Sequence, residues 1–121
     1  MNAEIRTQLD LSYLEMMSDG DDFMKKTMID MLIEELPAEV VKLRQAYLEQ
    51  NAESLKQVAH KMKSTLAFIG HAAMTRANAA LEDIGREKVD LQRASPHLGV
   101  MEEHTPKVLV ALRAESAAIA V

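Results

Sequence analysis

The sequence from Asn51 to Gly70 reads NAESLKQVAHKMKSTLAFIG. Asparagine is a favourable N-cap for a helix, and glycine tolerates the positive φ that commonly follows a helix C-terminus. Apolar residues recur between them every three or four positions, which predicts an amphipathic helix with one buried face. That face comprises Leu55, Val58, Met62, Leu66 and Ile69. The fold follows from the helices that cover it.

Two helices are expected before this one. Asp10 is a suitable cap for a short helix over residues 11–18, and Gly20 ends it. A longer helix over residues 21–50 carries apolar residues at three-to-four spacing and has Pro37 in its interior. Because proline removes one helical hydrogen bond, this segment is either one kinked helix or two abutting helices.

Two more helices are expected after it. A helix over residues 71–84 is predicted to end at Gly85, and residues 86–96 are predicted to form a connection. The last helix runs over about residues 97–118 and bends at Pro106. The chain is therefore predicted to be all-α, an antiparallel four-helix bundle with a short extra N-terminal helix.

The composition limits the classes of protein to which the chain can belong. Its 121 residues are expected to form a single domain over residues 1–121. The absence of cysteine excludes disulfides, thiol nucleophiles and cysteine-ligated metals. The net charge of −5 and the aromatic content of 3% argue against nucleic-acid binding, which uses basic surfaces and stacking rings.

No segment of the sequence has the length and apolarity of a membrane span. The longest uninterrupted apolar runs cover residues 108–112 and 117–121, far below the roughly 20 residues that a spanning helix needs. Residues 1–10 lack the apolar core of a secretory signal. We therefore expect a cytoplasmic protein with no membrane partner.

The histidine of the central helix points away from the predicted core. At about 100° per residue, His60 lies opposite the apolar face. Lys56 and Lys63 lie one turn before and one turn after it, at spacings that bring side chains together. The two cations disfavour protonation of the imidazole, and a neutral imidazole has the lone pair that a nitrogen nucleophile needs. The same lysines would attract a phosphoryl group carried by that nitrogen.

The other aspartates, histidines and methionines are explained without a metal or binding site. The aspartates around Gly20 do not fit the spacing of a calcium loop and are better explained as helix caps. His71, His97 and His104 lack metal-ligand spacing and are expected at the surface, with His71 near the His60 side, so no metal site is predicted. Five methionines at helical core spacing are expected to fill the core rather than to form an adaptable binding groove. They are Met24, Met28, Met31, Met62 and Met74.

A histidine on a lysine-bearing helix face is most often a solvated side chain, but the residues around His60 resemble the histidine-containing phosphotransfer (HPt) domain family. The run Ala59-His60-Lys61-Met62-Lys63-Ser64 is followed by Gly70 at the helix end and by Leu81-Glu82 in the next helix. The family pattern has Ala-His, an aliphatic residue two positions on, lysine three on and a small residue four on. Met62 stands where leucine is commoner, and Ser64 stands where glycine is commoner.

This resemblance, which covers about residues 8–118, implies a role for the residues around the histidine. His60 would accept a phosphoryl group, and Lys63 would stabilise it. Glu82 matches a position where the family often has a polar residue that accepts from the other ring nitrogen, and Gln57 is a second candidate for that role. The residues expected to support the site are Lys56, Gln57, Ser64, Gly70 and Glu82. Those expected to dock a partner are Lys61, Ala67 and Phe68, with exposed residues of the first helix.

The resemblance implies a phosphocarrier rather than an enzyme. The chain has no glycine-rich phosphate loop, so no ATP site of its own is expected. A response-regulator receiver domain would bring the phospho-aspartate and its Mg²⁺, and the chain itself would bind no cofactor. His60 would take the phosphoryl group and pass it to another receiver, and a hybrid histidine kinase is a further expected partner. We expect a monomer. Two alternatives stay open, which are a non-phosphorylated helical adaptor that binds receivers and the phospho-accepting domain of a chemotaxis-type histidine kinase.

Overall fold

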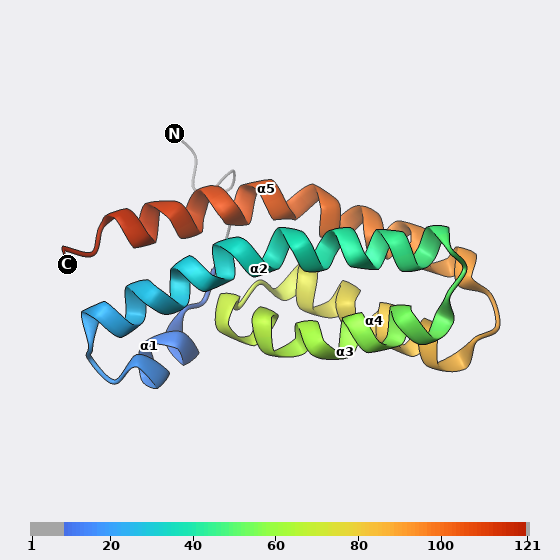
Figure 1. Cartoon of the computed structure of the whole chain (residues 1–121), viewed down its shortest axis with the longest axis horizontal. Coiled ribbons are helices and arrows are strands. Elements are labelled where there is room, and N and C mark those ends of the chain that lie inside the picture. Colours follow the sequence, from blue (N-terminus) through green and yellow to red (C-terminus); the bar gives the residue numbers. More distant parts are fainter. Residues whose placement is uncertain (1–8, 121) are drawn as a thin grey trace.

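The computed structural model describes residues 9–120. Those residues form five α-helices and one short 3₁₀ helix, with no β-strand among them (Figure 1). In chain order the elements are α1 (Ser12–Ser18), α2 (Asp22–Leu48), α3 (Ala52–Ile69), α4 (Ala72–Glu87), the 3₁₀ helix η2 (Leu91–Ala94) and α5 (Ser95–Ala117). The predicted all-α class and the short helix before the bundle are confirmed.

The four long helices pack as a bundle in which each contacts two long neighbours. α2 packs against α3 and α5, and α4 also packs against α3 and α5. Figure 1 shows that α2 and α5 extend beyond α3 and α4 at one end of the molecule. At that end α1 packs against both α2 and α3. The short first helix is therefore a neighbour of the helix that carries His60.

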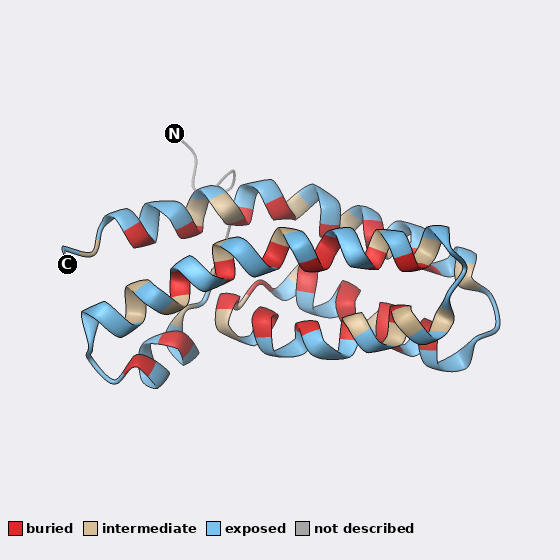
Figure 2. Ribbon diagram, viewed as in Figure 1, coloured by how far each residue is buried: buried red, intermediate tan, exposed pale blue. Residues whose placement is uncertain are grey.

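The core lies along the inward faces of all four long helices (Figure 2). The predicted apolar face of α3 points into it, and only Val58 of that set is partly buried rather than buried. The largest fully buried side chains are Leu14, Ile29, Leu36, Leu43, Leu55, Met62, Leu66, Ile69, Met74, Leu81, Leu98 and Met101. Because α3 has its apolar face in the core, its polar face with His60 is turned to the solvent.

The helix caps at both ends of α3 and at the start of α2 are those expected from the sequence. The side chains of Asp21 and Asn51 accept hydrogen bonds from the backbone N–H groups three residues on. Gly70 ends α3 with a φ of 67°, and a Cβ there would collide with the backbone of Asp10. The Asp10 N–H in turn donates to the carbonyl oxygens of Ile69 and Gly70, each at 3.2 Å. Gly70 therefore lets the segment before α1 lie against the end of α3.

Pro37 does not divide the second helix into two. α2 continues from Asp22 to Leu48 with Pro37 inside it, and α5 likewise continues through Pro106. Of the two possibilities open from the sequence, the single long helix is the one observed. Packing against α3 and α5 stabilises α2 and outweighs the hydrogen bond that proline removes.

The predicted end of the fourth helix at Gly85 is wrong. α4 continues to Glu87, and Lys88 takes the left-handed position after it with a φ of 59°. Gly85 is buried inside the helix, where an added Cβ would lie 2.7 Å from the Lys56 nitrogen and 2.9 Å from the Ala52 oxygen. The glycine therefore permits close approach of α3 and α4 instead of terminating α4.

The start of the last helix also differs from the prediction. Residues 91–94 form η2 rather than an irregular connection, and α5 begins at Ser95 instead of residue 97. Pro96 then lies in the first turn of α5. Proline is well accommodated there because the N–H that it lacks would have no helical partner. No helix within residues 9–120 combines the length and apolarity needed to cross a membrane.

His71 is not the surface residue that the sequence predicted. It is buried, its Nδ1 accepts a hydrogen bond from the Met74 N–H at 3.2 Å, and its ring lies 4.7 Å from that of His104. Burial lowers the pKa of His71, and His104 adds to that shift. His71 therefore acts as a neutral cap for α4 rather than as part of the His60 surface.

The expectation that five methionines fill the core is wrong for two of them. Met62 and Met74 are fully buried, and Met28 is partly buried against the core. Met24 and Met31 are exposed. Helical spacing predicts that both share the apolar face of α2, but Met24 lies in the first turn of α2 and Met31 lines an open groove between α2 and α3.

Candidate functional site

His60 lies in the middle of α3 with its side chain 70% exposed. The turn just before it is attached to α4, because the Asn78 side-chain amide donates to the Ala59 carbonyl oxygen at 2.8 Å. Both Ala59 and Asn78 are buried. The backbone that carries the imidazole is therefore held in place from two helices while the ring itself stays open to an approaching molecule.

Glu82 on α4 makes the shortest contact with the imidazole. Its Oε2 lies 2.8 Å from His60 Nδ1, and the Glu82 side chain is only 6% exposed. An ionised carboxylate can only accept a hydrogen bond, so Nδ1 carries the proton. In the neutral ring the lone pair is then on Nε2. The acid that the sequence resemblance placed near the ring is thus in contact with it.

Two cations share the Glu82 carboxylate with His60. Lys63 Nζ lies 3.0 Å from Oε1, and Arg86 Nη2 lies 3.2 Å from Oε2. The hydrogen bonds from His60 and Lys63 lower the pKa of Glu82, and they outweigh the effect of burial, which acts in the opposite direction. Glu82 is therefore ionised at neutral pH.

Arg86 is the residue of this cluster that the sequence reasoning missed. It lies one turn after Glu82 on α4 and also contacts Asp83 Oδ1 at 2.6 Å. The four-residue spacing from Glu82 is a signal that was available, since such pairs meet on a helix surface. The prediction of a connection over residues 86–96 conceals this pair, because α4 continues through Arg86.

Contrary to expectation, neither Lys56 nor Gln57 is hydrogen-bonded to the imidazole. Lys56 Nζ lies 3.3 Å from a Glu53 carboxylate oxygen, and the Gln57 amide donates to the same oxygen at 3.0 Å. Gln57 is therefore not the group that orients His60. Lys63 is likewise paired, with Glu82, so the charge in contact with the ring is a carboxylate rather than an ammonium group. The spacing along α3 alone predicts lysines at the ring, whereas the carboxylate in contact with it is the one that the resemblance implied.

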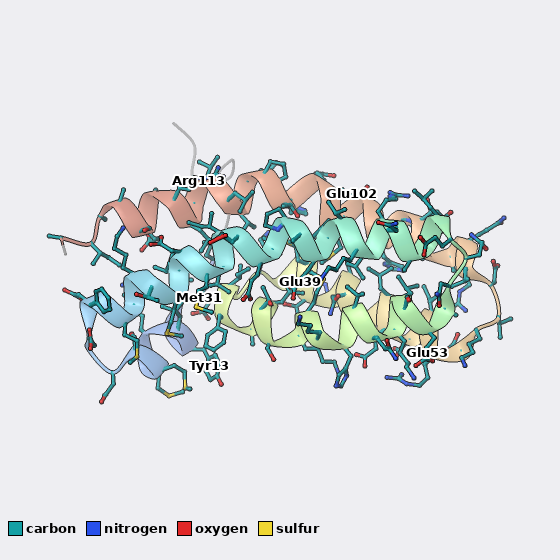
Figure 3. All side chains as sticks on the ribbon, viewed as in Figure 1. Tyr13, Met31, Glu39, Glu53, Glu102 and Arg113 are labelled. Atoms are coloured by element: carbon teal, nitrogen blue, oxygen red, sulfur yellow. The ribbon has the colours of Figure 1, made fainter. Side chains whose placement is uncertain are left out.

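Two hollows lie beside His60. The polar hollow is lined by charged and amide side chains at the seam of α3 and α4, namely Glu53, Lys56, Gln57, His60, Glu82 and Arg86. The apolar hollow lies one turn further along α3 and is lined by Tyr13, Lys63, Ser64, Ala67 and Phe68. The rings of Tyr13 and Phe68 are stacked with their centroids 4.9 Å apart, which ties α1 to the wall of this hollow. Figure 3 shows the positions of Tyr13 on α1 and Glu53 on α3.

The remaining residues expected at the site are distributed unevenly. Ser64 and Ala67 are exposed and small, and Phe68 is partly buried. Lys61 lines neither hollow, and its charge acts instead on Glu39 of α2. Within residues 9–120, no group of three or more histidine or acidic side chains is arranged to hold a metal ion. The groups that meet around the imidazole are Glu82, which contacts the ring, and Lys63 and Arg86, which contact Glu82.

The chain matches known proteins over most of its length. A comparison with protein-family models matches the Hpt domain over residues 27–118. The fold is similar to the crystal structure of histidine-containing phosphotransfer protein B (HptB) from Pseudomonas aeruginosa PAO1. That match has a TM-score of 0.80 and 21% sequence identity, and it covers 90% of this chain and 94% of the other. A search of curated protein sequences finds no match. The chain belongs to the Hpt domain family, whose role is histidine phosphotransfer in phosphorelays.

Proposed function

We propose that the chain is a phosphorelay carrier in which His60 accepts a phosphoryl group from the phospho-aspartate of a receiver domain and passes it to another receiver. The observation that carries this proposal is the contact of the buried Glu82 carboxylate with Nδ1 of an exposed imidazole, at 2.8 Å. This contact leaves the Nε2 lone pair available for attack while the backbone around it is held rigid. The family match supports the reaction class, and the receiver partners and the direction of transfer are part of the proposal.

The transfer step uses the two ring nitrogens differently. The Nε2 lone pair of His60 attacks phosphorus, the bond from phosphorus to the aspartyl oxygen breaks, and the receiver's carboxylate leaves with the bonding electrons. The ring then carries a positive charge, which the Glu82 carboxylate stabilises through the Nδ1 proton. The reverse sequence transfers the phosphoryl group to the next receiver. Proton uptake or release is not required in either direction.

Lys63 and Arg86 have different tasks in this step. Lys63 is exposed and held at Glu82 Oε1, one turn from the ring, so its ammonium group can rotate toward a phosphoryl group with about two negative charges. Arg86 contacts the other oxygen of Glu82 and continues to neutralise it when Lys63 moves. We therefore assign Lys63 to phosphoryl stabilisation and Arg86 to the positioning of Glu82. The Mg²⁺ that phosphoryl transfer needs is assigned to the receiver.

The receiver is proposed to dock on the apolar hollow. Ala67 and Ser64 are small enough to let another domain approach the ring, and Tyr13 and Phe68 offer a stacked aromatic wall. A monomer suffices for this arrangement, because all the named groups come from one chain. Lys61 lies outside both hollows, and we place it at the edge of the proposed interface with the receiver.

The proposal is tested by incubating the chain with Mg²⁺ and a panel of phospho-labelled receiver domains, next to a His60→Gln variant. We expect acid-labile label on the parent chain and none on the variant. Receivers that bind both proteins equally without transferring label would overturn the carrier function and favour the adaptor. Label that comes only from a kinase domain with ATP would instead favour the phospho-accepting domain of a histidine kinase.

A further inference from the structure

The methionines of residues 9–120 comprise a buried set, an exposed set, and Met28, which is partly buried against the core. Met62, Met74 and Met101 are fully buried. Four others are exposed, and all of them lie within one short part of the sequence. They are Met16 at 65%, Met17 at 49%, Met24 at 45% and Met31 at 52%. We call these four the methionine face.

The methionine face lies on neighbouring surfaces of α1 and α2. Met24 and Met31 are seven residues apart and therefore point to nearly the same side of α2. Lys25 Nζ lies 3.4 Å from a Glu15 carboxylate oxygen, so α1 and the first part of α2 lie side by side. Figure 3 shows Met31 and Tyr13 on the same side of the molecule, where yellow sulfur atoms gather around α1 and the first part of α2.

One residue of the methionine face, Met31, lines a groove that adjoins the hollow next to His60. Met31 and Met28 line an apolar groove whose other wall includes Ser64 and Phe68 of α3. Ser64 and Phe68 also line the apolar hollow that contains Lys63. The groove and the hollow therefore adjoin at Ser64 and Phe68, which places Met31 next to the surface proposed for the receiver.

We propose that the methionine face is an oxidation site through which hydrogen peroxide weakens receiver docking beside His60. The sulfur lone pair attacks one oxygen of hydrogen peroxide, the O–O bond breaks, and the released hydroxide takes the proton and leaves as water. Sulfur is oxidised to the sulfoxide and peroxide is reduced. Exposure of the side chain decides which methionines react, so the four exposed residues react before the three buried ones.

Oxidation of this face changes docking without unfolding the bundle. A sulfoxide is polar, and a receiver that covers it must remove water from the new oxygen atom. The core keeps its packing because Met62, Met74 and Met101 are excluded from solvent. A sulfoxide reductase would restore the thioethers, which makes the change reversible. This inference rests on the proposed carrier function, because receiver docking is the step that it regulates.

The test treats the full chain with hydrogen peroxide and follows three quantities. Peptide masses report which methionines gain oxygen, thermal unfolding reports the fold, and the initial rate of label transfer from a receiver reports docking. We expect oxidation of the methionine face first, an unchanged unfolding midpoint, and about a tenfold slower transfer that a methionine sulfoxide reductase reverses. Phosphorylation of His60 by the small donor phosphoramidate should be unaffected by peroxide, because it needs no docked receiver.

A matched pair of variants assigns the effect to the proposed residues. A chain with Met16→Leu, Met17→Leu, Met24→Leu and Met31→Leu should show the same transfer rate before and after peroxide. A Met101→Leu chain keeps the face and should lose transfer as the parent does. Oxidation of the face without slower transfer, or equal slowing in the fourfold variant, would overturn the inference. If the untreated parent takes no label from any receiver, the carrier proposal itself fails, and the peptide masses still report whether the face is the preferred oxidation site.

Discussion

The two hollows beside His60 share α3 but differ in chemistry, because α4 completes the polar hollow and α1 completes the apolar one. In the polar hollow, Lys56 pairs with Glu53 and Arg86 pairs with Glu82, so each cation is already neutralised by a carboxylate. The apolar hollow is lined mainly by small and aromatic side chains, and its one cation, Lys63, is paired with Glu82. Paired charges hold a reactive group in a defined state, whereas open apolar surface is suited to burial against another domain. We infer that the polar side serves the chemistry and the apolar side serves recognition.

Substitution of Glu82 should have the largest effect and should break the polar side. Glu82→Ala leaves Nδ1 without its acceptor, so the ring is no longer held in the reactive tautomer. We expect about a hundredfold slower phosphorylation of His60, both by a receiver and by phosphoramidate. Glu82→Gln keeps an acceptor but not the charge, and should be intermediate. Unchanged rates in Glu82→Ala would remove Glu82 from the mechanism.

Substitution of Gly85 should damage the seam on which the polar side is built. A Cβ at this position meets the backbone of Lys56 at 2.7 Å, so α3 and α4 must separate. We expect Gly85→Ala to lower the free energy of unfolding by about 1–3 kcal/mol. Denaturant unfolding measures this loss, and Gly99→Ala is the matched control, because a Cβ there meets nothing within 4 Å. Equal stabilities of the two variants would show that the helices do not rely on their close approach.

Substitution of Ala67 should impair the apolar side alone. A Trp at position 67 would project into the space proposed for the receiver, and it lies on the exposed side of α3. We expect Ala67→Trp to slow transfer from a receiver by about tenfold, as docking loses roughly 1.4 kcal/mol. The unfolding midpoint and the phosphoramidate rate should not change. A receiver rate equal to that of the parent would exclude Ala67 from the interface.

Acidification should have the smallest of these effects, which is the loss of the stability that ionised Glu82 contributes to the fold. The pKa of Glu82 lies below its ordinary value of 4.5 because His60 and Lys63 donate to the carboxylate. A carboxyl group with a lowered folded-state pKa stabilises the fold above its unfolded pKa, and this contribution is lost as the pH falls through the folded value. The thermal unfolding midpoint of the parent should therefore fall more steeply than that of Glu82→Gln as the pH is lowered below 4.5. Parallel curves would mean that the ion pairs of Glu82 do not contribute to stability.

Much of the helical framework could be predicted from local sequence. The periodic apolar face of α3, the caps at Asp21 and Asn51, and the glycine after Ile69 are signals carried within a few neighbouring residues. The same periodicity placed His60 on the solvent side. These features depend on helix geometry, which neighbouring residues specify whatever the rest of the chain does.

The contacts between helices could not be predicted from the sequence and are seen only in the folded structure. The sequence offered both Glu82 and Gln57 as partners of the imidazole, and the close approach permitted by Gly85 selects Glu82. Arg86 entered the cluster because α4 continues past the glycine that was expected to end it. Met24 and Met31 share the spacing of core residues, yet both are exposed, Met24 in the first turn of α2 and Met31 at an open groove between α2 and α3. Spacing along one helix states which residues share a face, but only the packing of the other helices determines what that face meets.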